Sequence, residues 1–119
     1  CIGLVSLLAA QACGASRVIV SDVIPLRLEV AKKLGAVTVN SREEDLLNKV
    51  AEITGGRGVD VVLDCAGFSV TVADSVRAAR PAGTIVVVGL GEDALNGIPL
   101  EGMNTGFPAV SGVRVFCIV

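Results

Sequence analysis

The residues whose types and spacing suggest a binding site are Gly3, at the start of an apolar helical stretch, and Asp22, directly after a β-branched run. Gly3 fits the last glycine of the pattern G-x-G-x-x-G, whose backbone approaches a pyrophosphate at a helix N-terminus. Asp22 follows it at close to the ~20 residues expected for the acid that binds an adenosine ribose. The two residues predict a dinucleotide site, and we expect the first strand and the other two glycines to precede residue 1.

The charge of Asp22 indicates which dinucleotide would bind. A carboxylate accepts hydrogen bonds from the ribose hydroxyls and repels a 2′-phosphate, so NAD is favoured over NADP. Arg27 keeps NADP open as an alternative, because arginine also binds that phosphate; it could equally stack on the adenine or be a solvated helix charge. A plain turn role for Asp22 is the remaining alternative.

Small residues follow two later runs that are rich in valine. These are Cys65-Ala66-Gly67 and Gly89-Leu90-Gly91. Ligands of parallel sheets bind outside the carboxyl ends of the strands, so we expect both turns to line the crevice where backbone meets ribose or nicotinamide. For Gly67 and Gly89, ordinary turn chemistry is the alternative.

Several kinds of chemistry lack the residues they require. The chain has no histidine, tyrosine or tryptophan, so neither a histidine-based triad nor a tyrosine-dependent reductase can operate in it. Its four cysteines form no C-x-x-C pair, which predicts reduced thiols and no metal site. Asp60 and Asp64 lie among apolar residues and do not form a catalytic acid pair. We therefore expect no catalytic residue and no metal ligand within this chain.

Length and composition indicate one globular domain over residues 1–119. Hydrophobic residues make up 52% and charged residues 18%, which suits a packed core. The formal net charge of −2 is not concentrated in runs, so we expect no nucleic-acid partner and no membrane association. Reduced cysteines and no signal peptide predict a cytoplasmic location.

Apolar residues alternate between helical and strand spacing along the whole chain. This alternation predicts an α/β fold, a doubly wound parallel sheet of the Rossmann type that lacks its first strand. We expect helices at about 2–13, 25–34, 42–54 and 70–80, and strands at 17–21, 37–39, 59–63, 84–88 and 113–118. Residues 89–112 show no clear period and are expected to form a loop with one short element at most.

Four further expectations concern single elements of the fold and its edges. Ser41 and Glu44 have the spacing of a capping box and predict the start of the third helix. The nearly all-apolar run at 84–88 predicts a strand covered on both faces. A missing central strand would leave unpaired backbone groups, so either the chain is a fragment or another segment fills the gap. Exposed sheet edges also predict self-association.

With these residues in place, the chain closely resembles the NAD-binding domain of the zinc-dependent medium-chain dehydrogenases, especially the sorbitol and xylitol dehydrogenases. The matching stretches are IGLVSLLAAQACGASRVIVSD, RLEVAKKLGA, GVDVVLDCAG, ARPAGTIVVVGLG and the final VRVF. They cover the chain from Ile2 to Gly91 almost without interruption. This combination is far more specific than a single glycine motif.

The resemblance implies roles in cofactor binding and none in catalysis or metal binding. The implied contacts are Ile2, Gly3 and Leu4 at the pyrophosphate, Asp22 at the adenosine ribose, Arg27 by the adenine, Cys65, Ala66 and Gly67 beside adenine and ribose, Gly89, Leu90 and Gly91 near the nicotinamide, and Phe116 at the carboxamide end. The chain departs from the family at Cys1, at Cys117 and over residues 92–112. The departure over residues 92–112 affects the expected crevice floor and subunit edge.

The resemblance also implies a function for the longer enzyme. It would be an NAD-dependent polyol dehydrogenase that oxidises a secondary alcohol to a ketone, with its catalytic zinc in a domain outside this chain. We expect NAD(H) and a small polyol or alcohol as partners, a homo-oligomer, and no activity from this chain alone. The alternatives are a non-catalytic NAD(H)-sensing module and, with less support, a methyltransferase.

Overall fold

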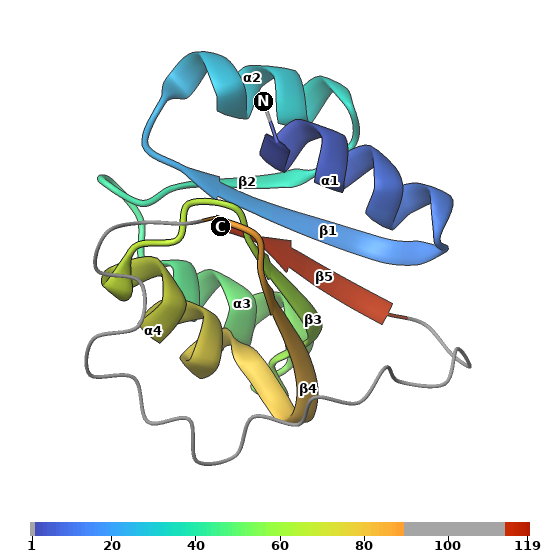
Figure 1. The fold of residues 1–119 in the computed structure, drawn as a ribbon, viewed down its shortest axis with the longest axis vertical. Helices are drawn as coiled ribbons and strands as arrows, with labels where there is room; N and C mark the ends of the chain where they lie inside the picture. The colour runs from blue at the N-terminus through green and yellow to red at the C-terminus, as the bar shows by residue number, and fades with distance from the viewer. Residues whose placement is uncertain (1, 90–113) are drawn as a thin grey trace.

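The computed structural model describes residues 2–89 and 114–119, which form one parallel sheet between two pairs of helices (Figure 1). Its elements, in chain order, are α1 (Ile2–Ala12), β1 (Ala15–Asp22), α2 (Pro25–Lys33), β2 (Val37–Asn40), α3 (Leu46–Thr54), β3 (Val59–Asp64), α4 (Ser69–Ala78), β4 (Ala79–Val87) and β5 (Arg114–Ile118). The strands are all parallel, in the order β2-β1-β5-β3-β4. The expected α/β fold with a parallel sheet is confirmed.

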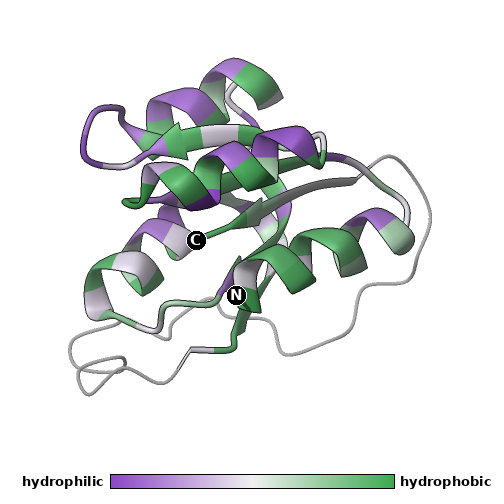
Figure 2. Ribbon diagram, turned by 90° about the horizontal axis from the view of Figure 1, so that it is seen from above, coloured by the Kyte–Doolittle hydropathy of each residue, from purple (hydrophilic) through white to green (hydrophobic). Residues whose placement is uncertain are grey.

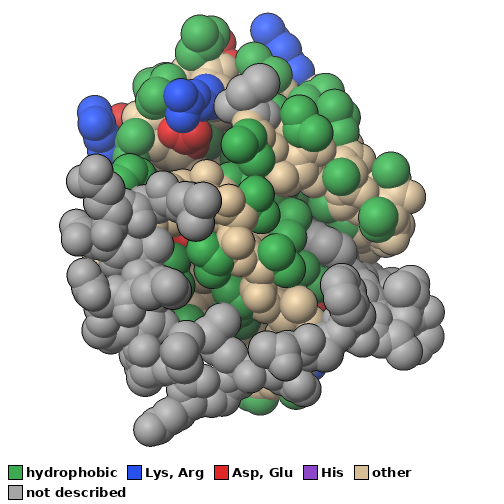
Figure 3. All heavy atoms as spheres, in the orientation of Figure 1, with side chains coloured by type: hydrophobic (Ala, Val, Ile, Leu, Met, Phe, Trp, Pro, Cys, Tyr) green, Lys and Arg blue, Asp and Glu red, His purple; other side chains and the backbone are tan. Residues whose placement is uncertain are grey.

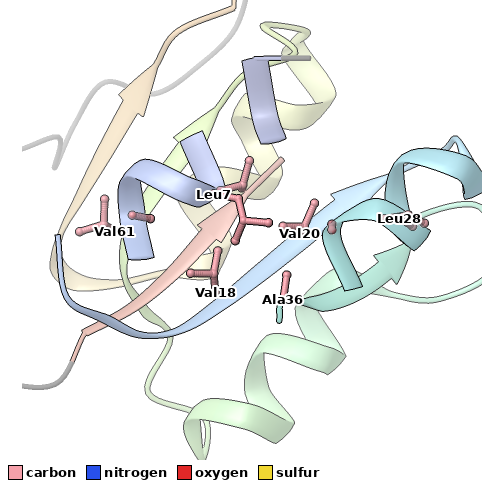
Figure 4. Packing of buried hydrophobic residues seen from close by; sticks show 9 residues of the cluster. Leu7, Val18, Val20, Leu28, Ala36 and Val61 are labelled. Carbon is pink, nitrogen blue, oxygen red and sulfur yellow. The ribbon is translucent and has the colours of Figure 1, made fainter. Parts of the chain in front are cut away.

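The core has one layer on each face of the sheet, because successive strand residues point to opposite faces. In β1, Val18 and Val20 pack with Leu7 of α1 and Leu28 of α2, as Figure 4 shows. Ile19, between them, belongs to the second cluster, which includes buried residues of α3 and α4. The continuous valine and isoleucine runs are explained by this burial on both faces.

The last strand of the chain lies in the middle of the sheet. β5 pairs with β1 through Ile19 and Cys117 and with β3 through Val62 and Cys117. In a doubly wound sheet of order 3-2-1-4-5-6, the position between these two neighbours belongs to the strand that precedes the first helix. In this structure β5 occupies that position, so the expected gap in the sheet is filled. Self-association remains a prediction.

Helix α3 begins later than the sequence predicts. The Oδ1 atom of Asp45 accepts hydrogen bonds from the backbone N–H groups of Leu47 at 2.8 Å and Asn48 at 3.3 Å, so Asp45 is the N-cap. Residues 41–44 form a turn in which Asn40 accepts the backbone N–H groups of residues 43 and 44. The predicted capping box at Ser41 and Glu44 is wrong, because this turn after β2 takes up the amides that a helix would use.

Strand β4 is longer and more exposed than the sequence predicts. It begins at Ala79, where α4 has ended, and Pro81 lies inside it. β4 is an edge strand, where a residue without an N–H group is tolerated. The expectation of a strand covered on both faces is wrong, since Val86 is 41% exposed. The outer edge of β4 has no strand beside it among the described residues.

Helix α1 is apolar along most of its length (Figure 2). Leu7 and Ala10 face the sheet, whereas Ile2, Val5 and Leu8 are exposed. Hydrophobic side chains are accordingly visible on the face drawn in Figure 3. No helix in the described part of the chain is both long and apolar enough to span a membrane.

The position of the α3 cap can be tested by two matched substitutions. Asp45→Ala should lower the free energy of unfolding by about 1 kcal/mol, because two helix amides lose their acceptor. Ser41→Ala, which removes the cap that the sequence favours, should change it by less than about 0.5 kcal/mol. Urea unfolding curves measure both values. A larger loss for Ser41→Ala than for Asp45→Ala would contradict the observed helix start.

The central position of β5 can be tested by thiol alkylation. Cys117 has no exposed surface, and burial raises its pKa to about 12, so its thiol stays protonated and unreactive at pH values near ~8.5. Iodoacetamide should modify the exposed Cys13 in the native chain and reach Cys117 only in denaturant. Peptide mass spectrometry measures both sites. Equal rates of modification at the two cysteines in the native chain would show that β5 does not occupy the centre of the sheet.

Candidate functional site

A pocket of about 540 Å³ lies at the carboxyl ends of the strands. The first turn of α1, the ends of β1 and β3, and the residues that close β5 form its walls. Parallel α/β sheets bind ligands at this edge, because the strand ends and helix N-termini converge there. The pocket is therefore the candidate binding site.

Most of the predicted cofactor-binding residues meet in this pocket. Those that line it are Ile2, Gly3, Leu4, Asp22, Arg27, Cys65 and Ala66. Gly67 and Gly89 lie next to this wall without lining it. The backbone of Phe116 belongs to β5, while its side chain, Leu90 and Gly91 lie outside what the structure describes.

Other pocket residues were not identified from the sequence. They are Val20, Ser21, Val23, Ser41, Phe68, Thr71, Ile118 and Val119. Several adjoin predicted residues in the chain and follow from that adjacency. Ile118 and Val119 do not, because their place in the wall depends on β5 lying between β1 and β3.

Asp22 ends β1 at the rim of the pocket. Its Oδ1 accepts the backbone N–H groups of Val23 at 2.7 Å and Ile24 at 3.0 Å, which fixes the turn before α2. Its Oδ2 lies 3.4 Å from Nη1 of Arg27, and the side chain is 24% exposed. A carboxylate offers about four lone-pair positions, so Asp22 keeps acceptor capacity toward the pocket.

The N-terminus of α1 supplies the second polar feature of the pocket. Ile2, Gly3 and Leu4 form its first turn and line the wall. The first N–H groups of a helix have no intrahelical partner and carry partial positive charge, which attracts anions. A Cβ atom on Gly3 would lie 3.6 Å from Cγ2 of Ile118, an ordinary contact, so this glycine is not required by packing.

The turn after β3 is shaped by Asp64, a residue that sequence reasoning set aside. Its carboxylate is fully buried, and Oδ1 accepts the backbone N–H groups of Ala66 and Gly67, each at 2.9 Å. Its Oδ2 accepts the hydroxyl of Thr71, also at 2.9 Å. An aspartate followed by small residues is typical of such turns, but nothing in the spacing indicated the bond to Thr71.

The two glycine-containing turns predicted for the crevice are packed against each other. A Cβ atom on Gly89 would lie 2.5 Å from the carbonyl carbon of Ala66 and 2.5 Å from the nitrogen of Gly67. Only glycine fits this position without a shift of backbone. The ends of β3 and β4 are therefore held together behind the pocket wall.

Cys65 connects the turn after β3 to α1 and to the end of the chain. Its Sγ lies 3.5 Å from Oγ of Ser6, and its backbone N–H donates to the carbonyl of Val119 at 3.1 Å. Across residues 2–89 and 114–119, no group of three His, Cys, Asp or Glu side chains could hold a metal ion.

Comparison with known proteins links this architecture to one family. The family model described as "Zinc-binding dehydrogenase" matches residues 1–117. Sorbitol dehydrogenase of Bacillus subtilis is 40% identical over 118 residues, which cover 98% of this chain and 32% of that protein. The chain thus spans about a third of the length of this curated relative.

Solved structures of two enzymes agree with that match. Alcohol dehydrogenase TADH from Thermus sp. ATN1 superposes with a TM-score of 0.76 at 34% identity, over 99% of this chain and 32% of that one. The quinone oxidoreductase of Escherichia coli, solved in complex with NADPH, gives a TM-score of 0.71 at 34% identity, over 84% of this chain and 30% of that one.

The contrast between Gly89 and Gly3 gives a test of this packing. Gly89→Ala should lower the free energy of unfolding by roughly 1–3 kcal/mol, because its methyl group would overlap the backbone at Ala66 and Gly67. Gly3→Ala should cause no loss, since its methyl group has room and alanine favours a helix by up to ~1 kcal/mol. Denaturant unfolding of both variants checks the difference, and equal stabilities would refute the described contact.

Proposed function

The chain belongs to the zinc-binding dehydrogenase family, and from that premise we propose that it is the NAD-binding part of an alcohol or polyol dehydrogenase. The longer enzyme would oxidise a secondary alcohol to a ketone by transferring hydride to the cofactor. One observation carries the proposal: Asp22 and the N-terminus of α1 line the same pocket at the carboxyl ends of the strands.

The chemistry of the pocket fits the parts of a dinucleotide. The N-terminal amides of α1 suit a pyrophosphate, which helix termini bind through N–H groups and the helix dipole. The carboxylate of Asp22 suits the hydroxyls of the adenosine ribose, and the side chain of Arg27 suits the adenine face. Cys65, Ala66 and Gly67 would lie beside adenine and ribose.

The ionic environment of Asp22 supports NAD over NADP. The guanidinium of Arg27 lies 3.4 Å from the carboxylate of Asp22, which partly compensates the positive charge of Arg27. That charge is therefore less available to bind a 2′-phosphate. The carboxylate itself would repel that phosphate. NADP is the competing cofactor, because a solved relative of 34% identity was crystallised with NADPH.

The chain's own contribution would be to bind NAD(H) and to orient the nicotinamide, with Gly89, Leu90, Gly91 and Phe116 at that end. The described residues do not provide a metal-ligand group, so no step is assigned to zinc in this chain. On this proposal, zinc and the proton relay belong to the rest of the enzyme, and the chain alone is inactive. The enzyme would be a cytoplasmic homo-oligomer that acts on a small alcohol or polyol.

The cofactor assignment can be tested by calorimetry on the 119-residue chain. The chain should bind NAD more tightly than NADP, and Asp22→Asn should weaken NAD binding by about tenfold or more, because a charged acceptor of the ribose hydroxyls is lost. Asparagine preserves the side-chain oxygen that caps the turn, so the fold should be retained.

A control substitution separates this effect from a general loss of negative charge. Asp74→Asn removes a charge on α4, where the side chain pairs with Arg77 and lies outside the pocket. It should leave NAD affinity unchanged. No binding by the unaltered chain, or equal losses in the two variants, would reject the assignment of Asp22.

A further inference from the structure

The buried carboxylate of Asp64 lies behind the pocket wall and does not line the pocket. Its hydrogen-bond partners in the described part of the chain are two backbone N–H groups and one hydroxyl, all neutral. Burial of a carboxylate without a cationic partner costs several kcal/mol unless hydrogen bonds replace its hydration. The three hydrogen bonds of Asp64 offset that cost, so the buried charge is tolerated only while the turn after β3 and Thr71 stay in place.

The hydrogen bonds of Asp64 connect the two turns that follow β3 and β4. Its side chain holds the amides of Ala66 and Gly67, and its backbone carbonyl accepts those of Val88 at 2.7 Å and Gly89 at 3.0 Å. One residue thus determines the shape of the turn after β3 and the position of the turn after β4. The close approach of Gly89 to Ala66 depends on both.

Thr71 extends this network into helix α4. Its hydroxyl contacts Oδ2 of Asp64 at 2.9 Å and accepts the N–H group of Phe68 at 3.1 Å, at the first turn of the helix. Both Thr71 and Phe68 line the pocket.

We propose that Asp64 is a positioning residue for the bound dinucleotide, which it affects through the turn at residues 65–67 and through Thr71. This inference rests on the proposed function, because it assigns the turn to the adenosine ribose. The carboxylate does not touch the ligand. It holds Cys65 and Ala66 in the wall and keeps Gly89 against Ala66, so that the crevice has its binding shape before the ligand arrives.

The hydrogen-bond chemistry distinguishes two substitutions at this position. Asp64→Ala removes the acceptor for the Ala66 and Gly67 amides and leaves them unpaired in a partly buried turn. Asp64→Asn keeps one acceptor oxygen for these amides, while its amide nitrogen can donate to Oγ1 of Thr71. Asparagine should therefore preserve the turn that alanine destroys.

The experiment measures NADH affinity by calorimetry and amide hydrogen exchange by NMR, below the unfolding midpoint of every variant. Asp64→Ala should weaken NADH binding by about tenfold or more and accelerate exchange at Ala66 and Gly67 by at least about tenfold. Asp64→Asn should stay within about threefold of the unaltered chain in both measurements.

The matched control is Asp60→Ala at the opposite end of β3. Asp60 is also buried and pairs with Arg80 at 2.7 Å and Arg57 at 3.3 Å, away from the pocket. This variant should lose stability while its NADH affinity stays unchanged. If Asp64→Ala fails to fold, Thr71→Val replaces it, with Thr71→Ser as the variant that restores the hydroxyl and the affinity.

The outcomes separate this inference from the proposed function. Failure of the unaltered chain to bind NADH would overturn the proposed function and, with it, the role of Asp64 in nucleotide binding. Normal binding by the unaltered chain together with normal binding by Asp64→Ala, or by Thr71→Val in its place, would overturn only the role of Asp64. An equal loss of affinity in Asp60→Ala would do the same, since it would reduce the effect to general destabilisation.

Discussion

Parallel pairing of β5 with both of its neighbours is the interaction on which the rest of the structure depends. In the order of strands, β1 and β2 lie on one side of β5 together with the helices α1 and α2. β3 and β4, which belong to the second half of the fold, lie on its other side. The adjacent residues Cys117 and Ile118 enter opposite core clusters, so this one strand contributes to both layers. The pocket draws Asp22 from the first half and Ala66 from the second. It exists only because β5 sets the distance between them.

Patterns that reflect burial predicted the fold well. The valine-rich runs correspond to β1, β3 and β4, and the helical spacing of apolar residues corresponds to the four helices. The resemblance to the medium-chain dehydrogenases is confirmed by the family match over residues 1–117. Local signals failed where two of them competed. Helix α3 is capped by Asp45 and not by Ser41, because the backbone N–H groups of residues 43 and 44 are bonded to Asn40 in the turn after β2.

The site was predictable only in part, because only some of its residues are placed by spacing along the chain. Asp22 follows from its spacing to Gly3, since one strand and one helix separate them and both have fixed geometry. Thr71 and Asp64 do not, because a hydrogen bond between two polar side chains leaves no periodic trace in a sequence. Val119 enters the pocket through the unusual place of β5, which no local pattern encodes. The binding roles of all these residues stay predictions.

The central place of β5 also has a consequence for how the molecule comes to be made. The strand that joins the two halves leaves the ribosome about fifty residues after its partner β3. Pairing across such a separation must overcome a large loop-closure entropy, which slows folding. During translation the nascent chain therefore leaves the pairing edges of β1 and β3 open until β5 emerges, and that interval is when chaperones would have most to protect.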